Sequence, residues 1–187
     1  MSNGVNKIIF GFVGPIASGK STVCQYLKEK HQASIYKFST PLRDILARIY
    51  QEINRDNLQN LSSALRQSFG DDLLALTITN DIKNEKNNLI AIDGVRREPD
   101  IKYLKEIPGF YLIEINSEQK TRWERITKRG ENSDDNQKTF AEFQADEQKE
   151  AERQIKEVAK LAKFKVDNNG TRDELYRQVE EILKNIG

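Results

Sequence analysis

The segment Gly14–Thr22 constrains the fold of this chain more than any other feature. It reads Gly, four further residues, then Gly-Lys-Ser-Thr; it directly follows the apolar run Ile8–Val13 and precedes a helical pattern. Glycines let a backbone wrap around an anion without Cβ clashes, and the free N–H groups of the next helix point at the same anion. In such a loop the lysine reaches the β- and γ-phosphates, and the following hydroxyl ligates Mg²⁺. We therefore predict a buried strand, a phosphate-binding loop and a helix that together bind a nucleoside triphosphate.

The whole loop is expected to contact the nucleotide, with Lys20 also acting in catalysis and Ser21 also holding the metal. A glycine-rich turn that matches the motif by accident is the alternative, but a strand before it and a helix after it argue against that reading. The expected nucleotide-binding residues of the loop are Gly14, Pro15, Ile16, Ala17, Ser18, Gly19, Lys20, Ser21 and Thr22.

Bulk composition limits the other possibilities. The 187 residues suffice for one well-cored domain, which we expect to span 1–187, and are too few for two large ones. The net charge of +1 gives no overall field for nucleic acid or an anionic membrane, and the lone Cys24 excludes an internal disulfide framework and suits buried packing. No apolar run approaches the roughly 20 residues of a membrane span, and there is no signal-peptide pattern. We expect a cytoplasmic protein, monomeric or homodimeric, with no nucleic-acid or membrane partner.

Short apolar runs alternate with longer helical patterns, which is typical of a parallel sheet covered on both faces. The fold class expected is therefore α/β: a three-layer arrangement with a five-stranded, mostly parallel sheet, helices on both faces and a lid insertion. The predicted strands are Lys7–Val13, Ser34–Phe38, Leu89–Asp93, Phe110–Ile115 and Phe164–Asp167. The predicted helices are Lys20–Lys30, Pro41–Tyr50, Asn57–Ser68, Asp71–Lys83, Pro99–Glu106, Ser117–Lys128, Thr139–Ala162 and Thr171–Asn185.

A second strand ends in residues that suit phosphate and metal binding. The apolar run Asn88–Asp93 ends in a carboxylate, and in a doubly wound sheet ligands bind at the carboxyl ends of the strands. Asp93 is therefore expected to face the glycine loop, to share Mg²⁺ with Ser21 and to act in catalysis. A turn-forming Asp-Gly pair is the alternative. Of the two arginines that follow, Arg96 is expected to bind a phosphate through two hydrogen bonds, and Arg97 is expected to lie in solvent.

An acceptor site is predicted after the second strand, in Phe38–Asp44. Helix capping alone would explain the hydroxyls of Ser39 and Thr40. The two hydroxyls, the free N–H groups of the helix and the guanidinium of Arg43 also make a second anion site, however. Two anion sites at one sheet edge suggest a donor and an acceptor phosphate. The expected acceptor-binding residues are Ser39, Thr40, Arg43, Arg66 and Arg96.

The polar segment Gly130–Lys138 lies between two charged helices and reads equally well as a flap, over about 129–139, or as a solvated loop. Arg122, Arg125 and Arg129 are three and four residues apart, so they share a helical face that ends at this segment, and Arg153 follows it. An arginine stripe is commonly a solvated surface. A flap edged with guanidinium groups would instead exclude water and neutralise charge during phosphoryl transfer, so we expect Arg125 and Arg129 to be catalytic.

Five segments together resemble the P-loop nucleoside monophosphate kinases and the related dephospho-coenzyme A kinases. They are GPIASGKST at Gly14–Thr22, FSTPLRD at Phe38–Asp44, AIDGVRR at Ala91–Arg97, RWERITKR at Arg122–Arg129 and VDNNGTRDEL at Val166–Leu175. The resemblance covers nearly the whole chain. It implies ATP and Mg²⁺ as cofactors, a flexible lid, and an acceptor-binding helical region over about 39–86. It also implies that Arg125 and the turn with Asn169 and Gly170 contact the donor nucleotide.

One departure from the family pattern bears on the acceptor. Dephospho-coenzyme A kinases tend to carry aspartate at the end of the second strand, where it can deprotonate a sugar hydroxyl, but this chain has Ser39-Thr40. An anionic phosphate acceptor needs positioning more than deprotonation. The leading hypothesis is therefore an ATP-dependent kinase that acts on a small-molecule acceptor, a nucleoside or deoxynucleoside monophosphate. A dephospho-coenzyme A kinase and an ATP-driven switch or assembly factor are the alternatives.

Overall fold

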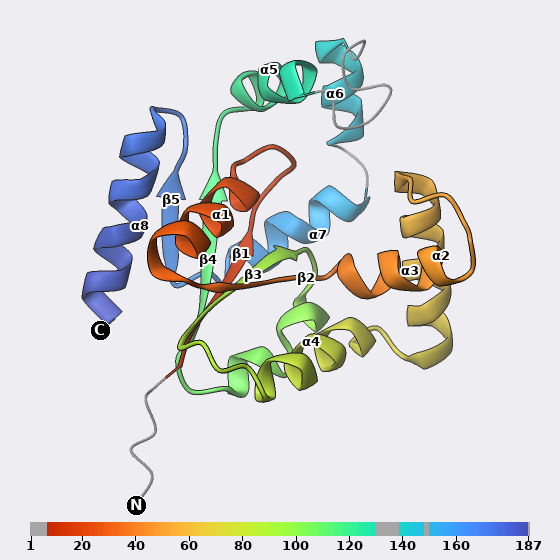
Figure 1. Cartoon of the computed structure of the whole chain (residues 1–187). Coiled ribbons are helices and arrows are strands. Elements are labelled where there is room, and N and C mark those ends of the chain that lie inside the picture. Colours follow the sequence, from red (N-terminus) through yellow and green to blue (C-terminus); the bar gives the residue numbers. More distant parts are fainter. Residues whose placement is uncertain (1–6, 130–138, 148–149, 187) are drawn as a thin grey trace, which may run out of the picture.

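The computed structural model describes residues 7–129, 139–147 and 150–186. Five parallel strands form one sheet in the order β2-β3-β1-β4-β5, with helices on both faces (Figure 1). The strands are β1 Ile8–Val13, β2 Ser34–Lys37, β3 Leu89–Val95, β4 Phe110–Asn116 and β5 Phe164–Asp167. The helices are α1 Lys20–His31, α2 Thr40–Arg48, α3 Arg55–Phe69, α4 Leu73–Lys83, α5 Gln119–Arg129, α6 Phe140–Asp146, α7 Glu150–Ala159 and α8 Arg172–Ile186. The predicted α/β class is confirmed, and the sheet is parallel throughout the described residues.

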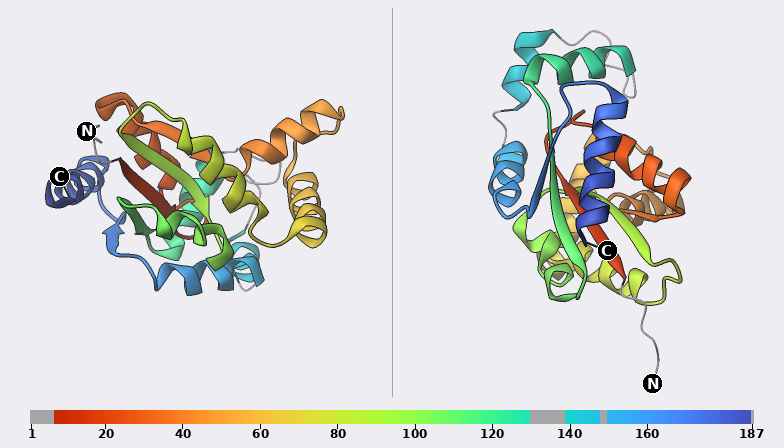
Figure 2. Two further views of the ribbon diagram at one scale, coloured as in Figure 1. Left: turned by 90° about the horizontal axis from the view of Figure 1, so that it is seen from below. Right: turned by 90° about the vertical axis from the view of Figure 1, so that its left-hand side faces the viewer.

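Alternation along the strands divides the apolar side chains between two cores. One core lies under α1 and α8, where Phe10, Phe12 and Ala91 meet Leu27 and Val179. The other core lies on the opposite face, where residues of β1, β3 and β4 pack against α4 and α7 (Figure 2). Because both faces are covered, the three central strands β1, β3 and β4 read as nearly continuous apolar runs, which is why their positions could be predicted from the sequence.

The helices α2 and α3 extend sideways from the sheet as an arm, at the right of Figure 1. Asn54 caps α3 by accepting a hydrogen bond from the N–H of Asn57 at 2.8 Å. The arm returns to the sheet through α4, whose buried residues Leu74, Ile78 and Ile82 join the core beneath β3. Among the described residues, no helix is both long and apolar enough to cross a membrane.

Two predicted helices are wrong in detail. The segment Pro99–Glu106 forms two short 3₁₀ helices, η1 Glu98–Ile101 and η2 Leu104–Glu106. Ile101 and Leu104 are both buried there. Asp100 accepts the N–H groups of the preceding loop, which holds the segment close to the end of β3.

The expected long helix Thr139–Ala162 is in fact α6 and α7. Glu147 lies in a turn after α6, and the two helices pack on different partners (Figure 1). Phe143 of α6 is buried beside α5, where the Arg122 guanidinium lies over its ring, whereas Ile155 and Val158 of α7 join the core under the sheet. One straight helix could not reach both partners. The predicted capping box between Thr139 and Glu142 is confirmed at the start of α6.

Candidate functional site

The glycine loop connects β1 to α1 and has backbone angles that only glycine adopts readily. Gly14 and Gly19 have φ of 151° and 107°. A Cβ at Gly14 would overlap the carbonyl oxygen of Ile115, and one at Gly19 would overlap the side chain of Asn168. The ammonium of Lys20 donates to the carbonyls of Gly14 and Pro15 at 2.8 and 2.9 Å, so the lysine lies folded over the loop.

Ser21 and Asp93 meet at the carboxyl edge of the sheet. The Ser21 hydroxyl donates to Asp93 Oδ2 at 2.7 Å, although the two residues are 72 positions apart. Asp93 lies near the end of β3, opposite Phe12 of β1, and is only 8% exposed. A hydroxyl and a carboxylate are hard oxygen ligands of the kind that Mg²⁺ prefers, so this donor set fits the expected metal.

Lys37 ends β2 next to the same carboxylate, a placement that the sequence analysis did not single out. The register pairs Ile35 with Ala91 and Lys37 with Asp93. Since Ile35 and Ala91 both pack in the core under α1, Lys37 and Asp93 also project from that face. Burial, followed by the nearby Asp93 charge, raises the pKa of the Cys24 thiol beneath them, while Lys37 and Lys20 lower it. The end of β2 therefore presents an ammonium.

Asn168 joins the glycine loop to the C-terminal part of the site. Its side-chain amide donates to the carbonyl of Ser18 at 2.7 Å, and the residue is only 6% exposed. Its own carbonyl accepts a hydrogen bond from Arg125 at 2.8 Å, and Arg125 also contacts the Ser117 hydroxyl at 3.3 Å. Burial lowers the pKa of Arg125. The arginine thus lies at the turn after β5, close to the loop.

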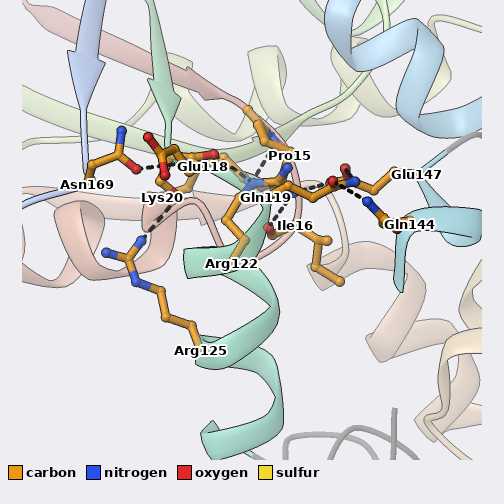
Figure 3. A network of polar contacts seen from close by, with 12 residues as sticks. Pro15, Ile16, Lys20, Glu118, Gln119, Arg122, Arg125, Gln144, Glu147 and Asn169 are labelled. Atoms are coloured by element: carbon orange, nitrogen blue, oxygen red, sulfur yellow. Dashed lines mark hydrogen bonds and ion pairs between the residues drawn. The ribbon is translucent and has the colours of Figure 1, made fainter. Parts of the chain in front are cut away.

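The two residues predicted in that turn lie differently. Asn169 is exposed, and its side chain accepts the N–H of Glu118 at 2.7 Å (Figure 3). The same side chain also donates to the carboxylate of Asp167. Gly170 is also exposed. Asn168 is therefore the asparagine that touches the loop. From the sequence the two neighbouring asparagines could not be distinguished, because the geometry of the turn decides which one points inward.

Arg122 is buried at the centre of the network in Figure 3. It forms an ion pair with Glu147, donates to the carbonyl of Ser117 at 2.9 Å, and reaches the carbonyl of Ile16 in the glycine loop at 3.5 Å. Gln119 donates to the other oxygen of Glu147 at 2.6 Å. Arg122 therefore connects α5 and α6 to the loop instead of projecting from the arginine face with Arg125.

The remaining lid predictions are divided between described and undescribed parts of the chain. The expected flap, 129–139, falls on 130–138 and lies outside the described residues, apart from its two ends. The side chain of Arg129 also lies outside them, while Arg153 is exposed on α7. The catalytic role expected for Arg129 remains a prediction.

On the acceptor side, most of the expected residues are accessible. Thr40, Arg43 and Arg96 are exposed, and Ser39 is partly exposed. Ser39 occupies the N-cap position of α2 without making a side-chain capping hydrogen bond, so capping does not account for its hydroxyl.

Arg66 is the exception among the expected acceptor residues. It is only 7% exposed, and its guanidinium pairs with Asp100 at 2.7 Å and donates to the carbonyl of Asp71. The structure therefore does not present Arg66 to an acceptor, because this arginine in the last turn of α3 pairs with a buried carboxylate.

Comparison with solved structures shows the fold class of the chain. The fold resembles a shikimate kinase from Bacteroides thetaiotaomicron with a TM-score of 0.64 and 11% identity, over 95% of this chain and 97% of that chain. A shikimate kinase from Aquifex aeolicus gives a TM-score of 0.58 and 16% identity, over 95% and 97% of the respective chains. At these identities the likeness shows the fold, which is that of the P-loop kinases.

Sequence comparison then gives the family. The family model described as "AAA domain" matches residues 11–159, so the chain belongs to that family. A relative from Methanococcus maripaludis, a UPF0200 protein, is 28% identical over 181 residues, which is 95% of this chain and 97% of the relative. These findings confirm the resemblance to P-loop kinases that the sequence predicted.

Proposed function

We propose that this chain is an ATP- and Mg²⁺-dependent kinase that phosphorylates a nucleoside or deoxynucleoside monophosphate. The products would be ADP and the nucleoside diphosphate. The observation that carries the proposal is the contact between Ser21 and Asp93, beside Lys20 and Lys37. It gathers a hydroxyl and a carboxylate that suit Mg²⁺, together with two ammonium groups, near three strand ends at the edge where ligands bind in doubly wound sheets.

On the donor side, the backbone of Gly14–Thr22 and Lys20 would hold the phosphates, after Lys20 leaves the carbonyls of Gly14 and Pro15. Ser21 and Asp93 would hold Mg²⁺, which neutralises charge on the phosphate oxygens. Arg125, beside the turn after β5, would contact the donor nucleotide. Arg129 keeps its proposed role at the transferring group.

On the acceptor side, Arg43, Arg96 and the hydroxyls of Ser39 and Thr40 would position the monophosphate. An oxygen of its phosphate attacks the γ-phosphorus while the bond to the β–γ bridging oxygen breaks, and ADP leaves with that electron pair. Lys37 supports an anionic acceptor. A sugar hydroxyl would benefit from a carboxylate base at the end of β2, whereas an ammonium there attracts a phosphate.

The test is an ADP-release assay with Mg-ATP and a panel of acceptors: AMP, CMP, GMP, UMP, dTMP, dephospho-coenzyme A and shikimate. The Lys20→Ala variant is the control. Release above this control with a monophosphate supports the proposal. Release only with dephospho-coenzyme A or shikimate would establish a hydroxyl kinase instead. Absence of acceptor-dependent release would reject the kinase and favour an ATP-driven switch that works through a partner. The proposed cytoplasmic location follows from the use of ATP and small-molecule acceptors.

A further inference from the structure

A buried ion pair connects the arm to the sheet edge. Arg66 of α3 and Asp100 of η1 are 34 positions apart, and their side chains are 7% and 2% exposed. Arg66 also donates to the carbonyl of Asp71 and contacts the Ser62 hydroxyl at 3.4 Å. Burying two charges costs desolvation that their attraction only roughly repays, so stability alone is a weak explanation for such a pair.

The second oxygen of Asp100 indicates what the pair does. Oδ1 accepts from Arg66, and Oδ2 accepts the N–H groups of both Arg96 and Arg97, each at 3.0 Å. These two amides belong to the loop that directly follows β3, the strand that carries Asp93. One carboxylate therefore closes this loop, and the guanidinium of Arg66 holds that carboxylate in its orientation. The side chain of Arg96 remains exposed.

We propose that Asp100 and Arg66 are positioning residues for the acceptor: they fix the backbone at Arg96 so that its guanidinium is presented to the acceptor phosphate. The inference rests on the proposed function, because it needs Arg96 to bind the acceptor. It also gives Arg66 a role that its burial allows, since it acts through Asp100 without touching the acceptor. The pair connects α3 of the arm to the end of β3, which are two parts of the acceptor side.

Asp100→Asn is the most informative variant because it keeps the shape of the side chain and removes its negative charge. An amide has one oxygen, so its NH₂ group must face either the guanidinium of Arg66 or the two backbone N–H groups. If the NH₂ group faces the guanidinium, the side chain loses its pairing with Arg66; if it faces the loop, the two closing hydrogen bonds are lost. In either case Arg96 loses its fixed direction. The KM for the acceptor should rise about tenfold, while the KM for ATP stays within about twofold.

The chain offers a matched control. Arg122 and Glu147 form a second buried pair, with side chains 7% and 8% exposed, which contacts the glycine loop on the donor side. Glu147→Gln removes a comparable charge there, so it should leave the acceptor KM unchanged. Arg66→Lys is a milder second variant, which keeps the charge next to Asp100 but loses the bond to the Asp71 carbonyl. It should raise the acceptor KM less than Asp100→Asn does.

The assay is steady-state kinetics with Mg-ATP and whichever of the five nucleoside monophosphates is turned over fastest, with circular dichroism to check folding. A higher acceptor KM in both Asp100→Asn and Arg96→Ala, but not in Glu147→Gln, supports the inference. If Arg96→Ala raises the acceptor KM and the folded Asp100 and Arg66 variants lower only kcat or thermal stability, the pair is structural and the inference fails while the proposed function stands. If Arg96→Ala leaves the acceptor KM unchanged, the proposed acceptor site itself is wrong.

Discussion

Replacing Asn168 with alanine should weaken both the fold and the binding of ATP. The variant removes the 2.7 Å hydrogen bond from the side-chain amide to the carbonyl of Ser18, in a place where Asn168 is 6% exposed. A hydrogen bond contributes about 1 kcal/mol net, and leaving a buried partner unpaired costs about 1–3 kcal/mol. We therefore expect a loss of about 2 kcal/mol in the free energy of unfolding. For a chain of this size that lowers Tm by about 4–8 °C.

The same change should loosen the glycine loop, because Asn168 packs directly against Gly19. If about half of the lost free energy falls on the conformation of the loop that binds phosphate, ATP affinity decreases about fivefold, since 1.4 kcal/mol corresponds to a factor of ten. Arg125 donates to the backbone carbonyl of Asn168, so this contact survives the substitution. The change in ATP affinity therefore reports on the side-chain amide alone. Thermal denaturation and isothermal titration calorimetry with ATP measure the two effects.

The neighbouring residue provides the control. Asn169 is exposed, and its side chain accepts the N–H of Glu118, so Asn169→Ala should change stability by less than about 0.5 kcal/mol. Asn168→Asp should be more harmful than Asn168→Ala, because it sets a carboxylate oxygen against the carbonyl of Ser18. Equal weakening of ATP binding by Asn169→Ala and Asn168→Ala would contradict a specific role of the Asn168 amide at the loop.

Four further predictions follow from single contacts. Asp93→Asn should lower kcat by about a hundredfold or more while the protein stays folded, and added Mg²⁺ should not restore the rate. Lys37→Met should raise the acceptor KM about tenfold, and the exposed Lys28→Met should not; equal effects would contradict a local role for Lys37. The hydrogen bond from Tyr26 lowers the pKa of Glu180 to about 2. The stabilisation of the fold by ionised Glu180 is therefore complete above the unfolded pKa of about 4.5 and is lost as pH falls through about 2. Glu180→Gln should cost about 1 kcal/mol at pH 7 and almost nothing below pH 2, as measured by urea denaturation. Cys24 should react with iodoacetamide about a hundredfold more slowly in the native than in the unfolded protein, because the thiol is buried and its pKa is raised.

Much of the fold followed from local patterns in the sequence. The three central strands are nearly continuous apolar runs because both of their faces are buried, and each of the five strands lies within about two residues of its predicted bounds. The Gly14–Thr22 spacing fixed the loop and its neighbours, since only glycine suits the φ angles at Gly14 and Gly19. The prediction of one helix over Thr139–Ala162 was wrong because local propensity does not show where one helix ends and the next begins. Here α6 packs on α5, whereas α7 packs under the sheet.

The sequence by itself determined the loop, the order of the strands along the chain and the identity of the charged residues near each strand end. Only the tertiary structure decided which of those residues meet. The neighbours of Asp93 depend on the sheet order, which places Lys37 beside it and Ser21 within hydrogen-bonding distance. Likewise, Arg66 became a buried partner of Asp100, because an arginine joins an anion site or a buried pair according to long-range packing that no local pattern encodes.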